Sequence, residues 1–218
     1  MIKSGSSMPY LPLFPLRLVA FPGESLNLHI FEPRYRQLIG ECHSEGTTFG
    51  INVTLEGKLM PVGTEIELLE IVQKHPKGEM DVRCRGVRTY RLRSYDNQAP
   101  EKLYAGGSVS FVDTKATASS ESALPVLERL RQLYQRLRVR KEIEETPENF
   151  STYQYAHHIG LSLEQEYELL TIPSEEHRRA FMLRHIEQLL PQIEEQSDLQ
   201  RRVSMNGHFK NALPPDLQ

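Results

Sequence analysis

The sequence predicts an α+β protein in which a small β-barrel or pseudo-barrel precedes a group of helices. About seven short stretches within residues 10–113 carry apolar residues at alternate positions between turn residues, a pattern typical of small barrels. A small, polar stretch follows at residues 113–122. Beyond it, apolar residues recur with the spacing of amphipathic helices. The change in periodicity predicts the change in architecture.

The barrel is expected to begin at Leu11–Ala20, where two prolines argue against a central strand and favour an edge strand, or two short strands broken at a proline. A Phe-Pro-Gly turn at residues 21–23 then reverses the chain. Residues 26–30 alternate apolar and polar side chains, as a half-buried strand does. Glu32-Pro33 predicts the start of a helix of about three turns, because proline is favoured at the first helical position.

The rest of the predicted barrel follows from alternation and turns. Thr48–Leu55 alternates strictly and predicts a strand. Residues 65–85 predict a hairpin with one solvent-exposed face, because His-Pro-Lys-Gly separates two alternating runs. Gly86 interrupts the second run, as a β-bulge does. A last strand is expected at about residues 103–112.

The helical part begins with a long amphipathic helix over about residues 121–145, which Thr146-Pro147 ends. Two shorter helices are expected at about residues 150–158 and 162–170, and a last one at about 174–196. The predicted organisation is a flexible leader at 1–9, the barrel with one short helix at 10–113, a linker at 114–122, a helical subdomain at 123–200 and an irregular tail at 201–218.

Composition excludes some classes of partner. The 218-residue chain has a formal charge of −3 and a pI of about 6.3, so it has no overall field that attracts nucleic acid or an anionic membrane. No run approaches the roughly 18 apolar residues of a spanning helix. Cys42 and Cys84 stand far apart without a CxxC motif, which fits a reducing compartment. We expect a cytoplasmic protein.

Motifs for chemistry are absent from the sequence. It contains no phosphate-binding Walker A loop, GxGxxG, HExxH or GxSxG, so no catalytic or cofactor-binding residue is predicted. His157 and His158 are neighbours, and neighbouring side chains on a helix point about 100 degrees apart, which disfavours a shared metal ion. Cys42-His43 has no evident third ligand. No metal site is predicted.

Two groups of basic residues are candidates for an anionic partner. The cluster on the long helix is interleaved with glutamates, which is ordinary for an exposed helix face; it comprises Arg129, Arg131, Arg136, Arg138, Arg140 and Lys141. The second group forms a stripe only if the strand faces align; it comprises Arg83, Arg85, Arg88, Arg91 and Arg93. The charged, solvent-exposed face of a sheet explains this stripe equally well.

Residues 11–39 carry the most specific motif, with FGINV at 49–53, VGT at 62–64 and the later AHHIGLSLEQEYELLTIPSEEHRRAFML in support. The motif reads LPLFPLR, FPG and LHIFEPRYRQLI at 11–17, 21–23 and 28–39. Here the chain resembles the Lon N-terminal (substrate-binding) domain family, over about residues 10–195. It departs from the family pattern at Leu18, where a polar residue is common, and at Asn27, where proline is frequent.

The resemblance implies a PUA-like pseudo-barrel packed against a helical bundle. It also implies a non-catalytic protein- or peptide-binding module similar to the substrate-recognition domain of Lon protease, an adaptor or client-binding protein. Its partners would be unfolded or degron-bearing polypeptides, another protein, or a separate ATPase or protease. The chain ends before an AAA+ ATPase or Ser-Lys protease domain begins, so we expect a stand-alone version that hydrolyses neither ATP nor peptides.

The predicted edge strand and the helix behind it supply candidate partner-binding residues, namely Phe14, Arg17, Phe31 and Tyr35. Phe31 and Tyr35 have an alternative role in filling the core beside the first helix. A second function, from a different class, is an RNA-associated protein, because PUA-like barrels include RNA binders and the arginine stripe offers a local patch. A third, a hydrolase, would require a buried Ser, His and acid in hydrogen-bonding reach.

Overall fold

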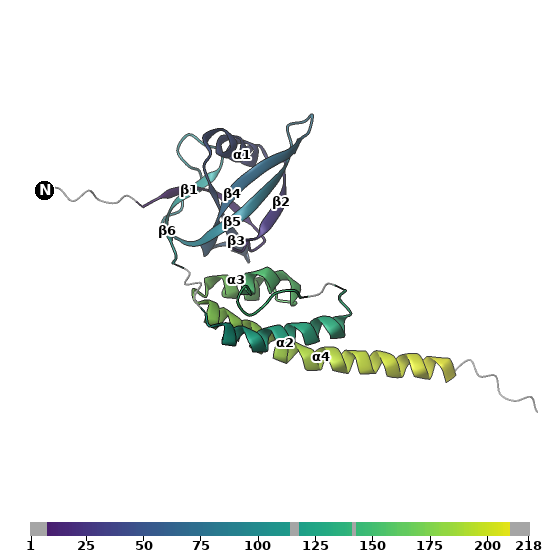
Figure 1. Cartoon of the computed structure of the whole chain (residues 1–218). Coiled ribbons are helices and arrows are strands. Elements are labelled where there is room, and N and C mark those ends of the chain that lie inside the picture. Colours follow the sequence, from purple (N-terminus) through teal and green to yellow (C-terminus); the bar gives the residue numbers. More distant parts are fainter. Residues whose placement is uncertain (1–7, 114–117, 141–142, 210–218) are drawn as a thin grey trace, which may run out of the picture. The chain divides into compact units, whose positions relative to one another are not determined.

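The computed structural model describes residues 8–113, 118–140 and 143–209 (Figure 1). These residues divide into two compact units. The first contains the chain up to Ala118 together with Ser151–Arg178, and the second contains Ser119–Phe150 together with the chain from Arg179 onward. Residues 151–178, which we expected in the helical subdomain, therefore lie in the unit that contains the strands.

Six strands form the sheet of the first unit (Figure 1). They are β1 (Tyr10–Leu16), β2 (Ser25–Ile30), β3 (Phe49–Leu55), β4 (Lys58–Lys74), β5 (Met80–Leu92) and β6 (Ala105–Phe111). Their order is β2-β5-β4-β3-β1-β6, and β5 also pairs with β6. This extra pairing closes five strands into a ring, while β2 pairs with β5 alone among the described strands. The predicted α+β fold with a PUA-like pseudo-barrel is confirmed.

The expectation of an edge strand at Leu11–Ala20 is wrong. β1 ends at Leu16 and lies between two neighbours, antiparallel to β6 and parallel to β3. The two neighbours are staggered along β1, because β6 pairs with residues 10–13 and β3 with residues 13–16. Pro12 and Pro15 each pair with one neighbour only, and this stagger is how an interior strand tolerates residues that lack an N–H.

The hairpin and the predicted bulge are confirmed. β4 and β5 pair antiparallel, and their register shifts where Glu65 faces Arg88 but Ile66 faces Gly86. Gly86 exchanges backbone hydrogen bonds with the Phe-Pro-Gly turn, at 2.9 Å to both the Gly23 N–H and the Glu24 carbonyl. A Cβ at Gly86 would lie 2.1 Å from the Phe21 carbonyl oxygen, so a side chain has no room there.

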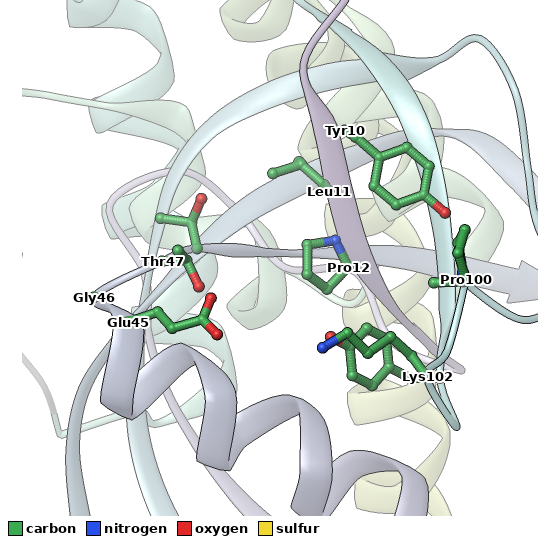
Figure 2. Close-up of a pocket in the computed structure, with 11 residues that line it drawn as sticks. Tyr10, Leu11, Pro12, Glu45, Gly46, Thr47, Pro100 and Lys102 are labelled. Atoms are coloured by element: carbon green, nitrogen blue, oxygen red, sulfur yellow. The ribbon is translucent and has the colours of Figure 1, made fainter.

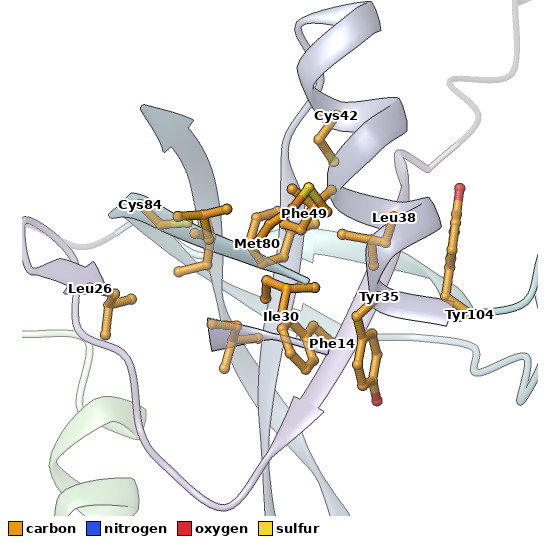
Figure 3. Close-up of a cluster of buried hydrophobic side chains, with 14 of the residues drawn as sticks. Phe14, Leu26, Ile30, Tyr35, Leu38, Cys42, Phe49, Met80, Cys84 and Tyr104 are labelled. Atoms are coloured by element: carbon orange, nitrogen blue, oxygen red, sulfur yellow. The ribbon is translucent and has the colours of Figure 1, made fainter. Parts of the chain in front are cut away.

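The first helix, α1 (Pro33–Glu45), packs its apolar face on the sheet (Figure 3). It starts at the predicted proline and ends at Gly46 in the left-handed conformation. Its buried residues are Tyr35, Leu38, Ile39 and Cys42. They join side chains from the strands, including Phe14, Ile30, Phe49, Ile66 and Val82, in the main core of this unit.

The segment at 151–178 adds the 3₁₀ helix η1 (Thr152–His158) and α3 (Leu163–Thr171) to the strands. The phenol of Tyr167 on α3 accepts a hydrogen bond from the Val62 N–H of β4 at 3.2 Å. Phe21 stacks on Tyr153 of η1 with ring centroids 5.0 Å apart. The two helices predicted in this stretch are present, the first as a 3₁₀ helix.

The second unit is helical. It contains α2 (Ser120–Leu137) and most of α4 (Glu175–Phe209). α2 ends at Leu137, and the next residue, Arg138, adopts a left-handed conformation with φ of 56°, so the expected continuation to residue 145 is wrong. α4 continues past residue 196, and the irregular tail is wrong for residues 201–209.

The predictions for the chain ends and for part of the linker concern residues that the structure does not describe. Residues 1–7 of the expected leader, 114–117 of the expected linker and 210–218 of the expected tail lie outside the described residues. Within the described part of the chain, no helix combines the length and the apolar character needed to cross a membrane.

Candidate functional site

A cleft of about 530 Å³ lies beside the start of β1 (Figure 2). This volume is in the range of ligand-binding pockets, roughly 300–1,000 Å³. Three separate stretches of the chain form its walls. They are Tyr10, Leu11 and Pro12 of β1, Glu45–Thr48 at the end of α1, and Ala99, Pro100, Lys102 and Tyr104 in the loop before β6.

Glu41 of α1 anchors the wall formed by the loop before β6. Its carboxylate accepts hydrogen bonds from the Tyr104 hydroxyl and from the Lys102 ammonium, the latter at 3.0 Å. These hydrogen bonds, chiefly that of Tyr104, lower the pKa of Glu41. Gln37 on the same helix accepts a hydrogen bond from the Leu103 N–H at 2.9 Å. The loop is therefore held in place by α1, and the cleft has a defined wall.

Tyr10 of β1 contributes an aromatic side chain to the cleft. Its hydroxyl donates to Asp96 at 2.9 Å. Burial, followed by the hydrogen bond to Asp96 and its negative charge, raises the pKa of Tyr10 to about 12. The residue is nevertheless 43% exposed. It offers an aromatic face that is fixed at its polar end, a combination common at protein-binding surfaces.

The backbone of β1 is paired on one side only along the cleft. Residues 10–12 pair with β6, and β3 reaches β1 only from Leu13 onward. The Val109 N–H donates to the Pro9 carbonyl at 2.8 Å. Because hydrogen-bonded and non-hydrogen-bonded pairs alternate in an antiparallel ladder, Leu11 faces β6 and the backbone N–H and carbonyl of Tyr10 face the other way. No described strand pairs with that side.

The four predicted contact residues do not come together. Phe14 and Tyr35 are buried in the main core, where their rings stack with centroids 3.8 Å apart (Figure 3). Arg17 is exposed beyond the end of β1, and Phe31 is 59% exposed after β2. None of the four lines the cleft. Tyr35 has the core-filling role given as its alternative, whereas Phe31 does not.

The sequence did not reveal the residues that line the cleft. Tyr10, Pro12, Pro100 and Tyr104 belong to two segments about 90 positions apart. The only local signal is the concentration of proline and tyrosine in each segment, which also fits ordinary turns. Their convergence depends on the pairing of β1 with β6, a long-range contact that has no local sequence pattern.

A cluster of possible metal ligands lies away from the cleft, at the open edge of the sheet. His29, His75 and Asp81 each place a ligand atom within 4.8 Å of the others. The sequence does not indicate this cluster, because its residues are distant along the chain and come together only through the pairing of β2 with β5. His157 instead lies between Glu24 and Glu166, and Cys42 is a buried thiol whose pKa burial raises to about 11.

The arginine stripe of β5 is compensated by glutamates of β4. Arg83 pairs with Glu70, Arg85 with Glu67 at 2.8 Å, and Arg88 with Glu65 at 2.6 Å. Arg93 donates to the Ser110 hydroxyl. The alignment of these faces therefore produces paired charges rather than a strongly positive surface, which weakens the case for an RNA-binding patch.

The comparisons with known proteins agree with the fold. The model of the ATP-dependent protease La (LON) substrate-binding domain matches residues 10–188. The chain is similar to a solved Lon N-terminal domain protein from Xanthomonas campestris, with 28% identity, a TM-score of 0.60, and coverage of 84% of this chain and 98% of that one. The N-terminal domain of Mycobacterium avium complex Lon protease has the same fold at 16% identity, with a TM-score of 0.65 and coverage of 82% and 98%.

The match confirms the resemblance, which the sequence motifs placed at about residues 10–195, and it runs from β1 through α3 into α4. The matched domain is the substrate-binding, non-catalytic part of its family, which supports a protein-binding module. Because the match spans most of the sequence, the chain belongs to the family of ATP-dependent protease La (LON) substrate-binding domains.

Proposed function

We propose that this chain is a non-catalytic polypeptide-binding protein that holds an extended client segment in the cleft beside β1. One observation carries the proposal. Tyr10–Pro12 pair with β6 on one side only, and these same residues line the cleft. An extended peptide would add to β1 as a short strand, with its backbone hydrogen-bonded to the N–H and carbonyl of Tyr10.

Strand addition suits a protein that receives varied clients. Main-chain hydrogen bonds supply affinity whatever the client's sequence, and side-chain contacts add selectivity. Here the side-chain contacts would come from Tyr10, Pro12 and Pro100. The expected clients are unfolded or degron-bearing polypeptides in the cytoplasm. Delivery to a separate ATPase or protease is the adaptor role that we assign to the chain.

Arg17 and Phe31 are exposed and are proposed as a second contact surface for the client or for a partner protein. Phe14 and Tyr35 would act through the core that supports β1 and α1. Because the arginines of β5 are paired with glutamates of β4, we favour this proposal over RNA binding.

The test measures the binding of short fluorescent peptides, tiled along an unfolded polypeptide, by anisotropy. We expect Tyr10→Ala to weaken binding at least about tenfold, because a buried aromatic contact at an interface contributes roughly 2 kcal/mol. Tyr95→Ala is the matched control, since Tyr95 is 44% exposed and lies outside the cleft. It should leave the affinity unchanged.

A second arm tests the strand geometry directly. Methylating alternate backbone nitrogens of a bound peptide removes its N–H donors and should abolish binding in one of the two registers. Equal binding of the methylated and unmethylated peptides would exclude strand addition. Equal effects of Tyr10→Ala and Tyr95→Ala would exclude the cleft.

A further inference from the structure

We propose that His29, His75 and Asp81 form a binding site for one divalent transition-metal ion, for which Zn²⁺ is the probe. The residues come from three segments of the first unit: β2, the turn between β4 and β5, and β5. Each histidine already points a ring nitrogen at the aspartate. His29 Nδ1 lies 2.7 Å from Asp81 Oδ1, and His75 Nε2 lies 2.7 Å from Asp81 Oδ2.

The donor set is one that zinc uses. Two imidazole nitrogens and a carboxylate oxygen, with a remaining position for water, make up many zinc sites. Around a tetrahedral Zn²⁺ with ligands at about 2.0–2.1 Å, neighbouring donor atoms lie roughly 3.3 Å apart. The three ligand atoms lie within 4.8 Å of one another. Small side-chain rotations would therefore bring them around an ion.

The backbone holds the three ligands together independently of an ion. His29 and Asp81 are direct partners in the antiparallel pairing of β2 with β5, so their side chains emerge side by side on one face. Two hydrogen bonds fix the backbone of His75. Its N–H donates to the Glu79 carbonyl at 2.8 Å, and its carbonyl accepts from the Gly78 N–H at 2.9 Å. The ligands need little ordering when an ion binds.

The surroundings admit an ion from solvent. The three side chains are partly exposed, and the two imidazole rings meet edge to face with centroids 5.8 Å apart. Phe31 stacks beside His29, with ring centroids 6.2 Å apart. A bound ion would tie β2, which pairs only with β5 among the described strands, to the tip of the neighbouring hairpin.

The experiment is a zinc titration of the full chain after removal of metals with a chelator, followed by calorimetry. We expect one Zn²⁺ per chain at neutral pH and a rise in the melting temperature. His75→Ala and Asp81→Asn should each weaken zinc binding at least about tenfold, because mutating residues that merely hydrogen-bond to metal ligands already costs this much. His43→Ala is the matched control, because His43 is exposed on α1 outside the cluster.

Two outcomes overturn the proposal. One is the absence of stoichiometric uptake by the wild-type chain, which is decisive even if a variant fails to fold. The other is zinc binding that survives both His75→Ala and Asp81→Asn.

Discussion

Tyr90 lies inside the ring of strands and links two of them. It is fully buried, and its hydroxyl donates a hydrogen bond to the side-chain amide oxygen (Oδ1) of Asn52 on β3. Asn52 in turn donates to the Met60 carbonyl at 3.0 Å. Glycines make room for the ring, because a Cβ at Gly50 or Gly63 would lie 2.2 or 2.7 Å from Tyr90 atoms. Burial strongly raises the pKa of Tyr90, so the phenol stays protonated.

Removal of this hydroxyl should destabilise the barrel. Tyr90→Phe leaves the buried side-chain amide oxygen of Asn52 without this donor, and we expect the free energy of unfolding to fall by about 1–3 kcal/mol. Chemical denaturation followed by circular dichroism measures the change. Tyr95→Phe is the control, because the Tyr95 hydroxyl is exposed. A loss no larger than that of the control would mean that the hydroxyl makes no net contribution.

The sequence predicted the strand that contains Asn52 but only half of its environment. Strict alternation in Thr48–Leu55 indicated one apolar face and one polar face. Gly50 and Asn52 lie on the polar face and are nevertheless buried. This face points into the ring of strands, which the pairing of β5 with β6 closes. Closure of the ring depends on a pairing between segments distant in the chain, so local alternation does not report it.

At the scale of elements, His157 joins the turn after β1 to η1 and α3. Its Nε2 lies 3.2 Å from Glu24 Oε1 and its Nδ1 lies 2.7 Å from Glu166 Oε1. Glu24 also accepts a hydrogen bond from the Phe21 N–H at 2.8 Å. The hydrogen bond to Glu24, followed by that to Glu166 and the charges of both acids, outweighs partial burial and raises the pKa of His157 to about 9.

The raised pKa predicts a stability that depends on pH. The protonated form is favoured in the folded state, so its contribution is fully present below the unfolded pKa of 6.5 and is lost as the pH rises through about 9. We expect the free energy of unfolding to decrease between these values. His157→Gln should remove this part of the pH dependence, whereas His158→Gln, at an exposed neighbour, should retain it. Identical pH profiles for the wild type and His157→Gln would refute the assignment.

The elements also show where local rules mislead. Prolines at 12 and 15 correctly excluded pairing along both sides of the whole strand, but a stagger between β3 and β6 satisfied that restriction without a free edge. Thr146-Pro147 disfavours a helix beyond residue 145, but α2 ends earlier, at Leu137. Each local pattern limits how far an element can extend, whereas tertiary contacts determine where the element ends.

At the scale of the molecule, the family and the fold class were predictable, whereas the cleft was not. Residues 11–39 carry specific motifs because they build one corner of the barrel, with a turn, a helix start and two strands in a short stretch. The cleft combines residues near 10, 46 and 102. Such a site forms only when the ring of strands closes, so the motifs that identify the corner of the barrel do not identify the residues of the cleft.

Charge distribution also becomes clear only in the whole molecule. The chain carries a net charge of −3, and its densest arginine stripe lies beside glutamates on the adjacent strand. The pairs Arg83–Glu70 and Arg85–Glu67 are exposed, so each contributes little to stability. Their main effect is on the local field, because each carboxylate cancels an arginine that would otherwise attract phosphate.

This cancellation distinguishes peptide binding from RNA binding. We expect the wild-type chain to bind single-stranded RNA no more tightly than about 10⁻⁴ M, the weak end of non-specific binding, and Arg85→Glu to change little. The double variant Glu67→Gln, Glu70→Gln exposes two arginine charges and should gain binding that weakens with salt. Fluorescence anisotropy at low and physiological salt measures both effects. Tight, salt-dependent binding by the wild type that Arg85→Glu abolishes would favour the RNA function instead.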